Sequence, residues 1–229
     1  MASGDQMQRE FVSYPKSGRT WIRYALYRLG VENLIRFHHD GCEFSGPVGE
    51  PLALDFTARL HRAREAGPIV YLSRDPRDLI VSLYFQITGR MRDIYSFDGD
   101  ISSFIRDEYF GAGNLYAFHR QWSELCRRGL ALHVTYEACH RKLEDVIRQI
   151  LDWYGLSVAN REVRAACESA EFQRMQEVEL SGRFEYPWLR PRNGATKTRQ
   201  GVVGSHAASL PADDIAYLNR LFAPDEATE

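Results

Sequence analysis

Residues 14–21, YPKSGRTW, place a lysine, two hydroxyl side chains and a glycine between a short apolar segment and an amphipathic one. The amides at a helix N-terminus and the helix dipole favour an anion, and Gly18 lets the backbone approach it closely. Ser17 and Thr20 add hydroxyl donors, and Lys16 adds a positive charge. This stretch predicts a phosphate-binding loop, although the usual G-x-x-x-x-G-K-[ST] pattern is missing. The structural alternative is an ordinary strand–helix turn with a surface lysine.

A second polar group lies in RDPRDLIVS, residues 74–82, directly after the apolar segment PIVYLS. Arg74 comes at the end of the expected strand, and Ser82 follows eight residues later in the next helix. A guanidinium at a strand's carboxyl end and a hydroxyl from the next helix are suited to bind a second phosphate-like group. A surface pair between Arg74 and Asp78 is the structural alternative.

A third group is TKTRQGVVGSH, residues 196–206, which carries basic residues and two glycines in a segment with little periodicity. Such a segment is most often a solvated loop. It is also typical of a lid that folds over a bound anion.

The elements that must position these groups alternate between strands and helices. We expect strands at 11–14, 34–37, 68–73 and 130–135, and helices at 20–29, 52–66, from Pro76 to about Ile87, 114–128, 143–154, 159–170 and 211–222. Asp75 is the expected N-cap of the helix that begins at Pro76. This order predicts an α/β fold with a central parallel sheet flanked by helices. In such a fold, ligands bind at the carboxyl ends of the strands.

The chain has 229 residues and a formal net charge of −2, so we expect no general attraction to nucleic acid or to a membrane surface. Its four cysteines include no C-x-x-C pair, and we expect no metal site. No apolar run approaches the ~20 residues that span a bilayer. We expect one cytoplasmic domain over 1–229, with a flexible N-terminus at 1–9 and a lid or substrate loop at 180–204.

Together these segments resemble the sulfotransferases that use 3'-phosphoadenosine 5'-phosphosulfate (PAPS), in particular a small prokaryotic-type member. YPKSGRTW is similar to the family's 5'-phosphosulfate loop, usually YPKSGTTW, and RQGVVG to its R-K-G-x-x-G segment. Arg74 and Ser82 have the spacing of its 3'-phosphate site, and Tyr136 in VTYE matches its tyrosine near the adenine. The matches come in family order and imply the P-loop-like sulfotransferase fold.

The resemblance implies that PAPS is the co-substrate, that no metal is needed, and that Lys16 stabilises charge on the leaving group. The residues that it implies for donor binding are Lys16, Ser17, Gly18, Arg19, Thr20, Trp21, Arg74, Ser82, Tyr136, Arg199, Gln200 and Gly201.

The family also uses a histidine after the second strand as general base, and IRFHHDG offers His38 and His39. We favour His39, because HDG resembles the form in small bacterial members, and keep His38 as the alternative. Strand alternation predicts that only one of the two faces the site. Asp40 would orient the imidazole or, more simply, form a turn. The other histidines have no motif context and are interpreted as structural: His61, His119, His133, His140 and His206.

Two departures from the family pattern stand out: Arg19 replaces the first threonine of the loop, and Gln200 replaces a lysine. The expected acceptor is a hydroxyl or amine of a small molecule or natural product. The aromatic and basic segment RFEYPWLRPR, residues 183–192, is suited to stack on a planar or phenolic acceptor or to meet an anionic sugar; the structural alternative is a Pro-rich surface loop. The oligomeric state stays open. The competing functions are a P-loop-type kinase and a non-catalytic nucleotide-binding protein.

Overall fold

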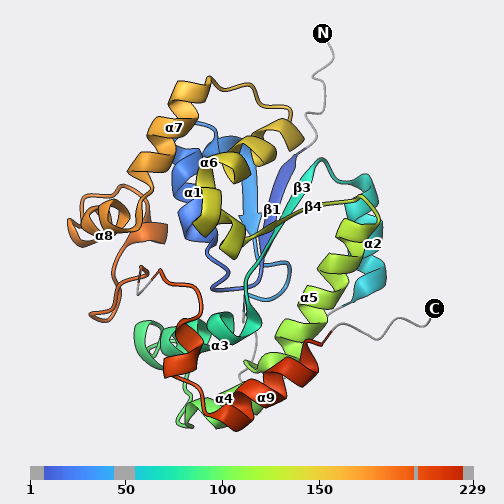
Figure 1. Cartoon of the computed structure of the whole chain (residues 1–229), viewed down its shortest axis with the longest axis vertical. Coiled ribbons are helices and arrows are strands. Elements are labelled where there is room, and N and C mark those ends of the chain that lie inside the picture. The colour runs from blue at the N-terminus through green and yellow to red at the C-terminus, as the bar shows by residue number, and fades with distance from the viewer. Residues whose placement is uncertain (1–7, 44–54, 199–200, 224–229) are drawn as a thin grey trace.

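The computed structural model describes residues 8–43, 55–198 and 201–223. Its sheet confirms the expected parallel architecture, with the strand order β2-β1-β3-β4 (Figure 1). The strands are β1 (Arg9–Ser13), β2 (Ile35–His38), β3 (Ile69–Ser73) and β4 (Leu132–Thr135). Since all four run in the same direction, their carboxyl ends meet at a single edge of the sheet.

Helices cover both faces of the sheet and extend below it (Figure 1). The α-helices are α1 (Arg19–Arg28), α2 (Phe56–Glu65), α3 (Pro76–Phe85), α4 (Ile101–Arg106), α5 (Ala112–Arg127), α6 (Tyr136–Trp153), α7 (Asn160–Ser169), α8 (Phe172–Leu180) and α9 (Ala212–Leu221). Short helical turns are η1 (Glu32–Leu34), η2 (Gln86–Arg90), η3 (Pro187–Leu189) and η4 (Ser205–Ala208). In Figure 1, α1, α6 and α7 lie on one side of the strands, and α2 and α5 lie on the other.

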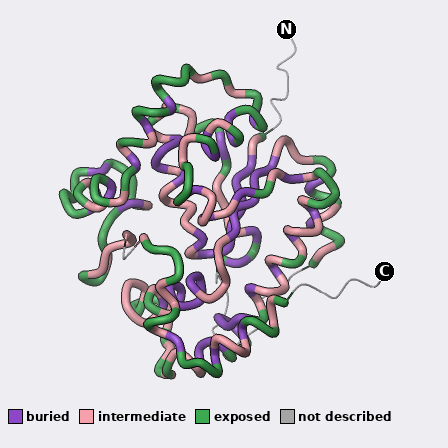
Figure 2. Tube along the Cα trace, viewed as in Figure 1, coloured by how far each residue is buried: buried purple, intermediate pink, exposed green. Residues whose placement is uncertain are grey.

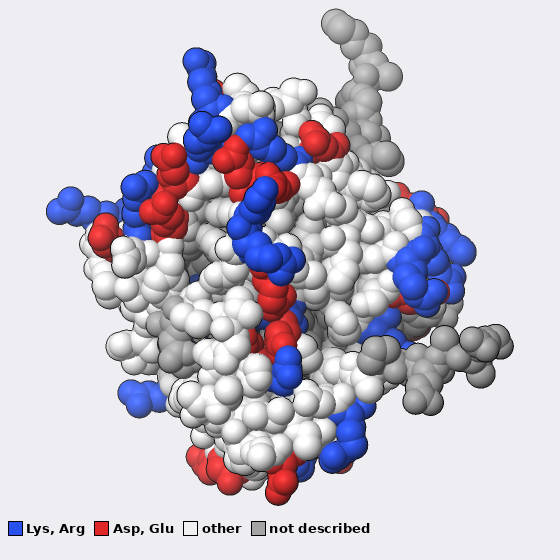
Figure 3. Space-filling model, viewed as in Figure 1, with Lys and Arg blue, Asp and Glu red and all other residues white. Residues whose placement is uncertain are grey.

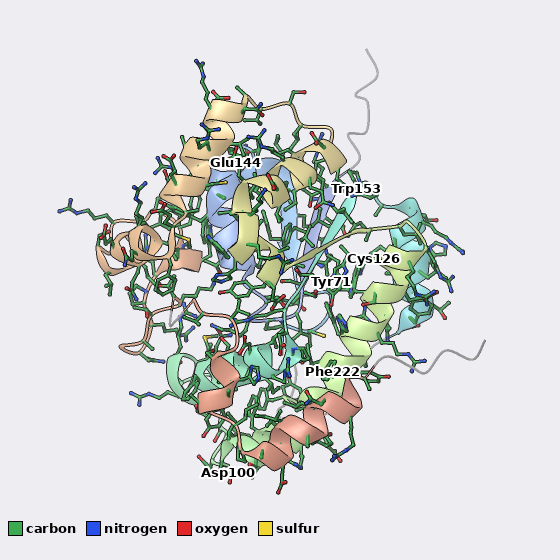
Figure 4. All side chains as sticks on the ribbon, viewed as in Figure 1. Tyr71, Asp100, Cys126, Glu144, Trp153 and Phe222 are labelled. Atoms are coloured by element: carbon green, nitrogen blue, oxygen red, sulfur yellow. The ribbon has the colours of Figure 1, made fainter. Side chains whose placement is uncertain are left out.

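Two apolar cores form on the two faces of the sheet because successive strand side chains point in opposite directions. Val70 and Leu72 pack with α1 and α6, whereas Ile69 and Tyr71 pack with α5. Figure 2 shows the strands buried through the centre of the molecule. Tyr71, labelled in Figure 4, lies between β3 and α5 and stacks on Trp122 with 5.8 Å between ring centroids. Burial on both faces accounts for the continuous apolar sequence of β3.

The helix after β3 begins as its sequence predicts. Asp75 is the N-cap, its carboxylate accepts from the amides of Arg77 and Asp78, and Pro76 occupies the first turn. The α-helical part ends at Phe85, and the chain continues as the π-helical turn η2. Such π turns are frequent at functional sites, and this one brings the end of the helix to the cavity described below.

Several boundaries differ from the sequence-based expectation. Helix α6 begins at Tyr136 rather than 143, because the Thr135 hydroxyl caps it at 3.1 Å from the Ala138 amide; a non-helical Lys142 interrupts it. Helices α4 and α8 were not expected. The flexible N-terminus predicted over 1–9 is wrong for Arg9, which lies in β1 and donates from Nε to the Tyr154 carbonyl at 2.9 Å. Residues 1–7 lie outside the described part.

The described surface carries charges of both signs. In Figure 3, basic and acidic side chains lie intermixed over α6 and α7. Within the described ranges, no helix has both the length and the apolar character that crossing a membrane requires.

Candidate active site

A cavity of about 400 Å³ opens at the carboxyl edge of the sheet. Each strand supplies a wall residue just beyond its end: His39 after β2, Lys16 after β1, Arg74 after β3 and Tyr136 after β4. Because the strand order is β2-β1-β3-β4, the sheet sets these four groups out in the order histidine, lysine, arginine, tyrosine. The motif residues predicted from separate parts of the sequence therefore line one cavity.

The loop after β1 is held in a left-handed conformation that most residues avoid. Lys16 has a φ of 72° and Gly18, the N-cap of α1, a φ of 96°. The Ser17 hydroxyl donates to the Tyr14 carbonyl at 2.9 Å, and Ser17 is buried. This differs from the expectation that the hydroxyl faces the anion: it closes the turn instead. A non-glycine residue at positive φ is costly and is characteristic of functional loops.

Gly18 lies directly against the ring of Tyr136. A Cβ at this position would stand 2.4 Å from Cδ2 of Tyr136, so only glycine fits. The guanidinium of Arg74 lies 4.3 Å from the centroid of the same ring, and its Nη1 donates to the Lys16 carbonyl at 3.2 Å. Trp21 meets Tyr136 edge-on, with 5.7 Å between centroids. The phosphate loop, the arginine and the tyrosine thus form one packed unit.

Asp78 ties the C-terminal segment to this unit. It is buried and does not pair with Arg74: its carboxylate accepts from the amides of Gly204 at 2.7 Å and His206 at 2.9 Å. Next to this contact, Gly201 lines the cavity, and a Cβ there would stand 2.3 Å from the ring of Phe172. Ser82 and Ser205 also line the cavity. The predicted site residues Arg199 and Gln200 lie outside the described residues.

The imidazole of His39 is half-buried, and both of its ring nitrogens have hydrogen-bond partners. Nδ1 is 2.6 Å from the Ser13 carbonyl, and Nε2 is 2.8 Å from Nη2 of Arg19. A carbonyl only accepts and a guanidinium only donates, so Nδ1 carries the proton and Nε2 is the acceptor. Burial, and then the charge of Arg19, lower the pKa of His39 well below its usual value. His39 is therefore neutral at pH 7.

The two adjacent histidines point to different places, as strand alternation predicts. His38 does not line the cavity, and its Nε2 lies 3.1 Å from the Glu10 carboxylate. Asp40 does not reach the imidazole of His39. It sits in a turn with a φ of 53°, and its carboxylate pairs with the guanidinium groups of Arg59 and Arg62. The turn role considered for Asp40 holds, and the orienting role does not.

Sequence reasoning missed several wall residues. Gln86, Arg90, Met91 and Tyr95 come from η2 and the segment after it, and His140, Phe172, Met175, Lys197 and Ser205 come from α6, α8 and the C-terminal segment. His140, which the sequence predicts to be structural, is one of these wall residues. Only Lys197 and Ser205 among them stand in one of the motif segments identified in the sequence, TKTRQGVVGSH.

The aromatic segment at residues 183–192 does not supply the expected stacking surface. Phe184 and Trp188 pack edge-on with Tyr27 of α1, with centroids 5.3 Å and 6.3 Å away, and neither lines the cavity. The contribution of this region to the wall comes from Lys197 and Thr198 instead.

Lys197 is a half-buried cation that pairs with no carboxylate among the described residues: its Nζ donates to the Trp188 carbonyl at 2.9 Å. Burial and the neighbouring charges of Arg90, Lys16 and Arg19 lower its pKa to about 7.

Among the residues that the structure describes, no three His, Cys, Asp or Glu side chains gather in a group that could hold a metal ion.

Comparison with known families finds the sulfotransferase domain over residues 64–227 of this chain. The matched region includes Arg74, Ser82 and Tyr136 but begins after the loop at 14–21.

Curated relatives extend the similarity over more of the chain. Sulfotransferase 2B1 of Homo sapiens is 26% identical over 242 residues, which cover 92% of this chain and 65% of that protein. Sulfotransferase 4A1 of Homo sapiens is 22% identical over 182 residues, covering 69% of this chain and 63% of that protein. This chain thus spans less than two thirds of the length of these relatives.

Solved structures share the fold. Mouse sulfotransferase SULT7A1, complexed with PAP, superposes with a TM-score of 0.69 at 17% identity, covering 96% of this chain and 83% of that one. Retinol dehydratase, in complex with androsterone and the inactive cofactor PAP, gives a TM-score of 0.67 at 15% identity, covering 93% and 79%. At such low identities the likeness establishes the P-loop-like α/β fold.

Proposed function

Because the chain belongs to the sulfotransferase domain family, we propose that it transfers a sulfuryl group from PAPS to a hydroxyl or amine of a small-molecule acceptor. We further propose that residues 1–229 form a single domain. The observation that carries the proposal is the convergence of Lys16, Arg74 and a neutral His39 on one cavity, each placed by the end of a different parallel strand.

The cavity wall fits the donor on its own geometry. Gly18 leaves space beside Tyr136 that a Cβ would fill, and helix N-terminal amides there favour a phosphate. The Nε of Arg74 is buried without a hydrogen-bond partner among the described residues, so it is available to a phosphate oxygen. We call the following residues the donor half of the cavity: Lys16, Gly18, Thr20, Trp21, Arg74, Ser82, Tyr136 and Gly201.

The chemistry follows from the placement of two side chains. PAPS would supply the sulfuryl group, and the leaving group would be adenosine 3',5'-bisphosphate, released through its 5'-phosphate oxygen. The ammonium of Lys16 stabilises the negative charge that develops on the leaving oxygen. His39 accepts the proton of the acceptor hydroxyl at Nε2, because Nδ1 is already protonated and bonded to Ser13. This step requires that Nε2 first part from Arg19.

We propose that the protein works in the cytoplasm, because its four cysteines are free thiols, as is usual in a reducing compartment. The four are Cys42, Cys126, Cys139 and Cys167.

Calorimetry with adenosine 3',5'-bisphosphate (PAP), the product of the donor, tests the proposal against the kinase alternative. We expect PAP to bind the full chain and ATP–Mg²⁺ to bind far more weakly, because the donor half offers a second anion site in Arg74 and Ser82. Preference for ATP–Mg²⁺ would sink the sulfotransferase proposal.

Turnover with labelled PAPS tests the role of Lys16. Lys16→Ala is expected to lower kcat by about 100- to 1000-fold, the usual effect of removing one stabilising group from a transition state. Lys142→Ala is the matched control, since Lys142 lies at the exposed break in α6 and is expected to leave turnover unchanged. Equal turnover by the two variants would remove Lys16 from the mechanism.

A further inference from the structure

Three cations line the cavity on the side of His39, apart from the two that the donor half uses. They are Arg19 from α1, Arg90 from η2 and Lys197 from the C-terminal segment. Arg19 donates to the Nε2 of His39 at 2.8 Å, and the charge of Lys197 also acts on His39. Arg90 in turn acts on Lys197. We call these three residues the cationic cluster.

The hydrogen-bond partners found for the cluster are neutral. Arg19 bonds the imidazole of His39, Nη2 of Arg90 donates to the Arg190 carbonyl at 3.0 Å, and Lys197 donates to the Trp188 carbonyl. Across the described residues, none of the three lies within salt-bridge distance of a carboxylate. All three side chains are half-buried, and a partly buried charge without a paired anion loses solvation with no ion pair to offset the loss. A bound anion would supply the missing partner.

Two N–H groups of the cluster are also unused. Nη1 of Arg19 and Nε of Arg90 are buried and have no hydrogen-bond partner in the described part of the chain. Buried polar groups in native proteins are nearly always paired, and the exceptions call for an explanation such as a missing ligand. Since both side chains line the cavity, that ligand would be the molecule bound beside His39.

Nearby carboxylates offset only part of this charge. Glu43 lines the cavity, and its carboxylate accepts the His39 amide at 2.9 Å. Glu179 is buried behind the wall, where its oxygens accept from the amides of Lys197 and Thr198 and from the Thr198 hydroxyl. Both carboxylates are thus bonded to other groups and leave the unused N–H donors of the cluster without an acceptor.

We propose that the acceptor is a small hydroxyl compound that carries an oxyanion group, such as a carboxylate, and that Arg19, Arg90 and Lys197 bind this group. The inference rests on the proposed sulfotransferase function and names the substrate class of the same site. A guanidinium presents paired N–H donors that match an oxyanion, and Lys197 adds a point charge. In the proposed reaction this cavity of about 400 Å³ holds the donor as well as the reacting part of the acceptor.

The same contact prepares the base. An anion bound to Arg19 competes with Nε2 of His39 for the guanidinium, and it releases the lone pair that must accept the hydroxyl proton. In the transfer step the acceptor oxygen bonds to sulfur, the bond from sulfur to the phosphate oxygen breaks, and the hydroxyl proton passes to Nε2. The anionic acceptor therefore exposes the base that acts on it.

Matched acceptor pairs test the proposal on the full chain. Labelled PAPS is offered with a phenol, a benzylic alcohol and an aliphatic alcohol, each as its carboxylate and as its carboxamide; 4-hydroxyphenylacetate and 4-hydroxyphenylacetamide form one pair. We expect kcat/KM to favour the carboxylate by about 10- to 100-fold, the usual worth of hydrogen bonds to a charged group. Calorimetry on the PAP-loaded protein should show the same order of affinity.

Arg90→Gln and Lys197→Met should each remove most of this preference while leaving PAP affinity unchanged. Arg127→Gln is the matched control, because Arg127 pairs with Glu124 on α5 and neither residue lines the cavity. The comparison within wild type needs no variant, so a variant that fails to fold does not decide the outcome.

Three outcomes would overturn the inference. The first is equal or better use of the carboxamides, which would leave the sulfotransferase proposal standing. The second is that no carboxylate binds or reacts while PAP binds normally. The third is that Arg90→Gln and Lys197→Met weaken the binding of PAPS but not of PAP, and leave the preference for carboxylate acceptors unchanged. This result would mean that the cationic cluster binds the sulfate of the donor. Absence of PAP binding would sink the proposed function and the inference together.

Discussion

The two halves of the cavity are built in different ways. In the donor half, Lys16, Arg74 and Tyr136 each follow a strand within three residues, so the sheet places them directly. We call His39 and the cationic cluster the acceptor half of the cavity. The cluster depends on contacts between distant segments, such as the hydrogen bond from Arg90 to the carbonyl of Arg190. A site placed by adjacent strands is rigid, whereas one assembled from turns and loops is free to vary. We therefore expect changes in the donor half to impair every reaction and changes in the cationic cluster to alter which acceptor is used.

The largest expected effect falls on His39, the proposed general base in the acceptor half. His39→Ala should lower kcat by about 100- to 10,000-fold, the usual contribution of a general base. His38→Ala is the control: His38 bonds Glu10 instead of lining the cavity, so it should keep near-normal kcat. Single-turnover kinetics with saturating labelled PAPS measure both. A larger loss in His38→Ala would reverse the assignment of the base.

The rigidity of the donor half is tested at Gly18. Gly18→Ala should weaken PAP binding by at least about 10-fold, because the new Cβ would stand 2.4 Å from Tyr136 and push the ring from its place. Gly30→Ala introduces a Cβ at a similar positive φ, 71°, but into open space. Both variants should lose about 1 kcal/mol of stability through the positive φ, and Gly18→Ala should lose more through the contact with Tyr136. Only Gly18→Ala should lose affinity.

Calorimetry with PAP and thermal unfolding separate the two effects. If Gly30→Ala lost as much PAP affinity as Gly18→Ala, backbone strain alone would account for the loss. The contact between residue 18 and Tyr136 would then make no contribution to PAP affinity.

The smallest effect is a shift in pH dependence on replacing Arg19 by the threonine of the family loop. Burial is the main cause of the lowered pKa of His39, and the Arg19 charge is the second. Since His39 must be neutral to act, activity falls at acid pH as it is protonated. Arg19→Thr should raise this pKa, although burial still holds it below its usual value, and so move the acid limb of the kcat/KM profile to higher pH.

Arg23→Thr is the matched control, because Arg23 lies on the same helix but pairs with Glu32 outside the cavity wall. An acid limb that stayed in place in Arg19→Thr would mean that this guanidinium does not set the protonation of His39. An equal shift in Arg23→Thr would point to general loss of positive charge.

The strand and phosphate-loop patterns in the sequence predicted the sheet well. Val70 and Leu72 belong to a continuous apolar segment, which is how a strand buried on both faces reads. The sequence predicts helix α6 too short, because its first two turns, YEACHRK, lack a clear apolar periodicity. The Thr135 cap and the packing of Tyr136 on Gly18 fix these turns. Local periodicity carries no information about either contact.

What the sequence by itself determined is the donor half. A strand, a tight turn and a helix N-terminus are adjacent in the chain, so Lys16, Gly18 and Arg74 carry their geometry in local spacing. Only the tertiary structure decided the acceptor half. Arg90 and Lys197 are more than a hundred residues apart, and they meet beside His39 because η2 and the C-terminal segment pack together over the same edge of the sheet. Burial and charge there depend on that packing, which no short stretch of sequence encodes.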